Sequence, residues 1–127
     1  LPIILGNYVE VRDGKSEEFD IETFNHGSAT RKVVAIFNEL GLGDDLQRAR
    51  DGRNIRAGKA TMRGRVHKTP KSVLLVVKEK AGLAKAVRNL PGVDVVAAKD
   101  LCAEDLAPGG DLGRLTVFTK SALEAMN

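Results

Sequence analysis

The 127-residue sequence has few of the side chains from which catalytic and metal sites are usually built. It contains one cysteine, Cys102, and two histidines, His26 and His67, which stand in no metal-ligand spacing. A single cysteine excludes an internal disulfide and any multi-cysteine metal site. We therefore predict no metal, no cofactor and no catalytic residue, and we interpret Cys102 as a small buried side chain.

Aromatic residues are also scarce, with no Trp, one Tyr and four Phe, and none lies between Phe37 and Phe118. Proteins that bind single-stranded nucleic acid commonly stack bases on aromatic side chains, so this scarcity argues against that class. Long apolar runs are absent too. The longest, Val73–Val77, has the length of a strand and not the roughly 20 residues of a membrane span. We expect no membrane partner.

What is present fits one folded domain, because 43% of the residues are apolar and 29% are charged. Stretches with strand and helix spacing alternate along the chain. The predicted strands are 1–5, 72–77, 93–98 and 115–119. The predicted helices are 28–40 (capped by Ser28), 44–50 (capped by Asp44 and Asp45), 81–90, one or two turns within 100–106, and a closing helix capped by Ser121. This order predicts a single α/β domain over residues 1–127, with three layers: a mostly parallel β-sheet flanked by helices.

The remaining segments are predicted to be irregular. Residues 8–26 are polar and without a clear period, and residues 107–110 form a turn. The glycines around this turn do not match the spacing of a phosphate-binding loop, so we interpret them as structural. The acidic residues between Glu17 and Glu22 are interpreted as a solvated face.

Positive charge is concentrated in one segment, residues 48–71. This segment holds nine Lys or Arg residues against one acid, a net charge of +8. The rest of the chain holds 11 basic and 16 acidic residues, a net charge of −5. Such a basic segment in an otherwise acidic domain indicates a localised anionic partner. We predict that the segment is a loop that binds this anionic partner.

Cations alternate with small residues within this loop, so that both guanidinium groups and backbone amides can approach phosphates. Without aromatic side chains, the loop is expected to recognise the backbone and shape of a nucleic acid rather than its bases. The candidate contacts to the nucleic acid, including one arginine outside the loop, are Arg48, Arg50, Arg53, Arg56, Lys59, Arg63, Arg65, His67, Lys68, Lys71 and Arg114.

Several motifs along the chain resemble the ribosomal protein L-four family of the large subunit, of the archaeal and eukaryotic type. The matching stretches are Ile55–Lys59 with Met62–Arg65, Pro70–Leu74, Arg88–Val96, and Leu106–Gly110 with Gly113–Thr116. The resemblance implies an α/β domain on the outer face of the large ribosomal subunit, bound to large-subunit ribosomal RNA. It also implies that this chain is the carboxy-terminal part of a longer protein, without the extension that reaches the peptide exit tunnel.

Two positions depart from the family pattern. Ala60-Thr61 stand where a glycine and a lysine are usual, and Asp111-Leu112 stand where a basic residue or histidine and a proline are usual. We therefore expect no RNA contact at Thr61 or Asp111.

Together these features predict a structural, non-enzymatic constituent of the cytoplasmic large ribosomal subunit. Its expected partners are large-subunit ribosomal RNA and other large-subunit ribosomal proteins, with no small-molecule substrate. Two alternatives remain open. One is a small α/β enzyme that binds a nucleotide or acidic metabolite at the carboxyl ends of its strands, and the other is an RNA-binding regulator that acts away from the ribosome.

Overall fold

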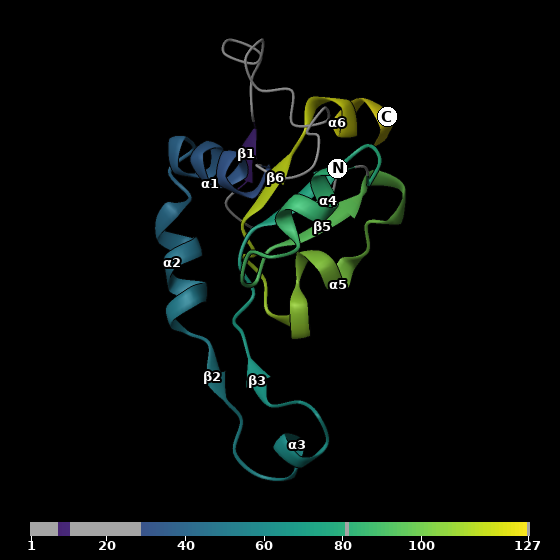
Figure 1. Cartoon of the computed structure of the whole chain (residues 1–127). Coiled ribbons are helices and arrows are strands. Elements are labelled where there is room, and N and C mark those ends of the chain that lie inside the picture. Colours follow the sequence, from purple (N-terminus) through teal and green to yellow (C-terminus); the bar gives the residue numbers. More distant parts are fainter. Residues whose placement is uncertain (1–7, 11–28, 81, 127) are drawn as a thin grey trace.

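The structure is a computed structural model that describes residues 8–10, 29–80 and 82–126 (Figure 1). Its centre is a parallel four-stranded sheet in the order β1-β6-β4-β5. The strands are β1 (Tyr8–Glu10), β4 (Leu74–Val77), β5 (Asp94–Ala97) and β6 (Thr116–Phe118). The parallel sheet confirms the predicted α/β class.

Strand β4 lies between two parallel neighbours, and Leu75 pairs with Val95 of β5 and Val117 of β6. The residues from Val73 to Val77 are all buried. A continuous β-branched and aliphatic run is typical of a strand that is covered on both faces, because successive side chains point to opposite sides.

Helices cover both faces of the sheet, which confirms the three predicted layers. On one face, α1 (Ala29–Glu39) and α4 (Gly82–Val87) pack against Leu75 and Val77 through side chains that include Phe37 and Val87. Helix α2 (Gly43–Asp51) follows α1 after a turn at Gly41. The other face carries a 3₁₀ turn, η3 (Ala98–Asp100), and the helices α5 (Ala103–Leu106) and α6 (Lys120–Met126). In the described ranges, no helix is both long and apolar enough to cross a membrane.

The basic segment is not a simple loop, contrary to our prediction. Residues 54–68 form an arm that consists of β2 (Asn54–Ile55), α3 (Lys59–Met62) and β3 (His67–Lys68). Strands β2 and β3 are antiparallel, with Ile55 opposite His67. Figure 1 shows the arm extending away from the sheet, with α3 at its tip. These elements are too short to leave a periodic pattern in the sequence.

The predicted helices and strands within the described residues are confirmed, with ends that shift by a few residues. The predicted strand 1–5 and the cap at Ser28 lie outside the described residues. Within 8–26, which was predicted to be irregular, β1 is a strand, so that part of the prediction is wrong. The turn at 107–110 is confirmed as a 3₁₀ turn, η4 (Pro108–Gly110).

The predicted helix caps at Asp44, Asp45 and Ser121 are wrong. Helix α2 begins at Gly43, so Asp44 and Asp45 occupy its first turn, where carboxylates interact favourably with the helix dipole. Helix α6 begins at Lys120, and its cap is Thr119, whose Oγ1 accepts a hydrogen bond of 3.3 Å from the backbone N of Ala122.

Candidate nucleic-acid interface

The arm is held together by its own backbone hydrogen bonds. The amide of Arg56 donates to the carbonyl of Val66 at 2.8 Å, and the amide of Arg65 donates to Ala60 at 3.0 Å. The Thr61 hydroxyl donates to the carbonyl of Arg56, which ties α3 back to the end of β2. Gly64 follows α3 with a φ of +77°, a conformation that glycine adopts without strain.

Almost every residue of the arm is exposed. Only Ala60 and Thr61 are half-buried, and the apolar side chains of Ile55 and Met62 are 69% and 81% exposed. The arm therefore has no hydrophobic core of its own. Its shape depends on the short ladder and the turns at its tip.

All charged side chains of the arm are positive. Its cations are Arg56, Lys59, Arg63, Arg65 and Lys68, and all five are exposed. The sequence holds no Asp or Glu between Asp51 and Glu79, and within the described part of the chain none of the five is ion-paired. His67 is also exposed and belongs to β3. Cations without acidic neighbours on a projecting hairpin are suited to neutralising the phosphates of a polyanion.

Two other predicted contacts, Arg48 and Lys71, lie at the base of the arm and are engaged in internal interactions. Arg48 forms an ion pair of 2.8 Å with Asp45, and its Nη2 donates to the carbonyl of Lys71 at 3.0 Å. The Lys71 Nζ contacts Asp94 Oδ2 at 2.8 Å. The Ser72 hydroxyl donates to the same Asp45 carboxylate at 2.6 Å. These contacts join the two ends of the arm to each other and to the sheet.

Arg114 lies apart from the arm, inside the domain. Its side chain is 4% exposed and pairs with Asp94 Oδ2 at 2.5 Å. Its other donors reach the carbonyls of Ser72 and Asp105, both at 2.9 Å, and Gly92 at 3.4 Å. Because all of these donors are used internally, the position of Arg114 does not suit it to a phosphate contact.

The Asp94 carboxylate is central to these contacts. Burial raises its pKa, but hydrogen bonds from Lys71 and Arg114, together with their positive charges, outweigh burial and leave the pKa below its ordinary value of 3.8. The sequence did not reveal this role, because Asp94 is 20 residues from Arg114 and 23 from Lys71.

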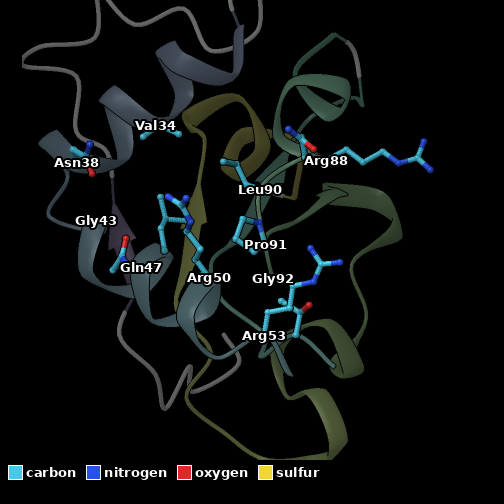
Figure 2. Close-up of a pocket in the computed structure, with 13 residues that line it drawn as sticks. Val34, Asn38, Gly43, Gln47, Arg50, Arg53, Arg88, Leu90, Pro91 and Gly92 are labelled. Carbon is cyan, nitrogen blue, oxygen red and sulfur yellow. The ribbon is translucent and has the colours of Figure 1, made fainter. Parts of the chain in front are cut away.

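Arg50 belongs to the last turn of α2, and Arg53 directly precedes β2. Both are exposed, and both line a cleft beside α2 (Figure 2). Among the described residues, neither side chain has a hydrogen bond or an ion pair. The Arg56 Nε donates to the carbonyl of His67 at 3.4 Å across the arm. The structure thus divides the predicted contacts into exposed arm residues without an acidic partner, two arginines at the cleft, and three residues that hold the fold together.

Cys102 is exposed, so the prediction that it is buried is wrong. It occupies the N-cap of α5, where its Sγ lies 3.1 Å from Asp105 Oδ2. Of the residues whose positions are described, no three His, Cys, Asp or Glu side chains cluster in a way that could hold a metal ion.

Comparison with known proteins gives a match to a family model and several similar curated proteins. The family model of the "Ribosomal protein L4/L1 family" matches residues 6–127. The chain is 54% identical over 104 residues to the large ribosomal subunit protein uL4 of Methanocaldococcus jannaschii, covering 82% of this chain and 41% of the relative. It is 48% identical over 95 residues to uL4 of Halobacterium salinarum, covering 75% of this chain and 38% of that protein.

A third relative, uL4 of Thermoplasma acidophilum, is 46% identical over 97 residues, which cover 76% of this chain and 38% of the relative. The chain thus matches about two-fifths of the length of these curated relatives. The match over residues 6–127 includes the sheet and the arm. The chain belongs to the ribosomal protein L4/L1 family.

Proposed function

We propose that this chain is a structural, non-enzymatic constituent of the large ribosomal subunit in the cytoplasm, and that its arm binds large-subunit ribosomal RNA. The observation that carries the proposal is the arm itself: five exposed cations with no acidic partner in the described residues, on a hairpin that has no core. Like charges held this close together repel one another, so a bound polyanion would stabilise the arm. The uL4 name of the relatives supports ribosomal RNA as that polyanion and other large-subunit ribosomal proteins as neighbours.

The residues proposed to contact RNA are fewer than the cations of the full basic segment. Arg56, Lys59, Arg63, Arg65 and Lys68 neutralise phosphates, and His67 adds a polar contact on the same hairpin. Arg48, Lys71 and Arg114 act indirectly, by fixing the base of the arm against the sheet. In this proposal the sheet and the arm work as one α/β domain, in which the sheet positions the arm.

The test is equilibrium binding of the 127-residue chain to large-subunit ribosomal RNA of Methanocaldococcus jannaschii, measured over a salt series. If five cations each neutralise one phosphate, the logarithm of the affinity falls with the logarithm of the salt concentration with a slope near −4, at about −0.7 to −0.9 per phosphate. Duplex DNA and unrelated RNA of equal length serve as competitors.

We expect saturable binding with this slope and a preference for the ribosomal RNA. A slope shallower than about −1 would rule out the arm as an electrostatic binding surface. A steep slope without preference for ribosomal RNA over the competitors would contradict the ribosomal assignment and favour the RNA-binding regulator.

A further inference from the structure

A cleft of about 790 Å³ separates α1 and α2 from the turn that follows α4 (Figure 2). One wall includes Asn38 of α1 and Gln47 of α2, and the opposite wall includes Asn89, Leu90 and Pro91. The volume lies in the range of about 300–1,000 Å³ that is typical of sites for nucleotide-sized ligands.

The lining of the cleft favours a ligand with an anionic part and a flat, hydrogen-bonding part. Thirteen residues line it, three of them are arginines and none is acidic. Figure 2 shows the side chain of Arg50 directed from α2 into the cleft, whereas the guanidinium of Arg88 points away from it. Guanidinium planes stack on bases as well as pairing with phosphates.

The other lining groups complete a surface that suits a base. Leu46, Leu90 and Pro91 provide apolar contacts, and the amides of Asn38, Gln47 and Asn89 each offer both donors and an acceptor for a base edge. The Gln47 amide donates to Asp51 at 2.9 Å and 3.0 Å, but this contact is exposed and local, so it can be exchanged for a ligand contact.

The cleft lies next to the base of the arm. Arg53 and Thr69, which lie immediately before and after the arm, both line the cleft. Gly92 also lines it and lies just before β5, while Thr69 lies before β4, so the cleft lies at the amino ends of these strands. Ligands of α/β enzymes bind at the carboxyl ends of the strands, so this position does not favour an enzyme-like site.

We propose that the cleft receives a single nucleotide that is extruded from the RNA bound by the arm. Arg50 contacts its phosphate or stacks on its base, and the amides on the two walls bind the edge of the base. This inference rests on the proposed function, because the arm must bring the RNA strand to the mouth of the cleft. Extruded bases are the part of a folded RNA that proteins read most readily.

The test fills the cleft without changing any charge. Gln47→Trp and Asn89→Trp each place a large side chain into it, from opposite walls. Ala35→Trp is the matched control, because Ala35 is an exposed residue of α1 that does not line the cleft. Circular dichroism and thermal melting establish which variants are folded, and the two walls provide independent variants. The probe is large-subunit ribosomal RNA of Methanocaldococcus jannaschii, mapped by base-specific chemical modification.

We expect wild type and Ala35→Trp to protect the base of one nucleotide, and both cleft variants to lose this protection. Affinity should fall about tenfold in the cleft variants, as expected when the contacts of one stacked base are lost, while the salt slope stays unchanged. Identical protection and affinity in all four proteins, with a steep slope, would overturn the cleft proposal alone. Failure of wild type to bind the RNA specifically would overturn the proposed function and the cleft proposal with it.

Discussion

Arg114 and Asp94 form an ion pair of 2.5 Å in which the arginine side chain is only 4% exposed. The same carboxylate oxygen also accepts a hydrogen bond of 2.8 Å from Lys71, which follows the arm. Asp94 thereby links the segment before β6, the end of the arm and the start of β5. Cations that look equivalent in the sequence therefore have two roles, since some fix the arm and others are free to bind.

Replacing Arg114 with alanine should destabilise the fold. The substitution removes one of the two cationic partners of Asp94, and it takes away the arginine donors from the carbonyls of Ser72 and Asp105. We expect a loss of about 2–4 kcal/mol in the free energy of unfolding, measured by urea denaturation. Arg63→Ala, on the exposed arm, is the control and should change stability by less than about 0.5 kcal/mol. Equal stability of the two variants would contradict the anchoring role of Arg114.

The stabilising effect of Asp94 should depend on pH. Its pKa in the folded protein is below the ordinary value of 3.8, so its contribution is fully present above that pH and is lost as the pH falls through the folded pKa. Wild type should exceed Asp94→Asn in unfolding free energy by a constant amount between about pH 5 and 7. This difference should shrink in more acidic solution. A difference that grows on acidification would show that the pKa is raised.

Gly92 should tolerate alanine much less well than Gly64. Both have a positive φ, +73° and +77°, but a Cβ on Gly92 would collide with the carbonyl of Pro70 and lie 3.1 Å from the amide of Ser72. A Cβ on Gly64 meets nothing within 4 Å. We expect Gly92→Ala to cost more than about 2 kcal/mol and Gly64→Ala about 1 kcal/mol, both measured by urea denaturation. Similar losses would contradict the close packing of Gly92 against the base of the arm.

The sequence predicted the layered fold because its signals are local. The run Val73–Val77 and the helical stripe around Val33 and Phe37 are visible within a few residues. The run contributes alternate residues to the core on each face of the sheet, and the stripe packs on one of these faces. Strand β1 and the hairpin of the arm were missed because two or three residues have no measurable period. Strand β1 is defined by its pairing with β6, and strands β2 and β3 are defined by their pairing with each other.

The candidate site was predicted only as a set of cations. Counting charges identified the basic segment, but it did not separate Arg48 and Lys71 from the free cations of the arm. That separation depends on Asp45 and Asp94, and Asp94 is 23 residues from Lys71. The cleft was missed for a related reason, since it combines residues of α1 and α2 with the turn after α4.

The central claim is that RNA is bound by the arm and not by the overall positive charge of the chain. Two triple variants that remove the same charge separate these possibilities. One replaces Arg56, Arg63 and Arg65 of the arm with alanine. The other replaces Lys78, Lys80 and Lys99 with alanine, which are exposed and follow the carboxyl ends of β4 and β5, opposite the edge from which the arm begins.

The decisive measurement is the salt dependence of binding to large-subunit ribosomal RNA for wild type and these two variants. We predict that the arm variant flattens the slope by about 2 to 3 units, since each lost phosphate contact removes about 0.7 to 0.9, while the lysine variant keeps the wild-type slope. Circular dichroism should show that all three proteins are folded. Equal slopes for the two variants would contradict the account.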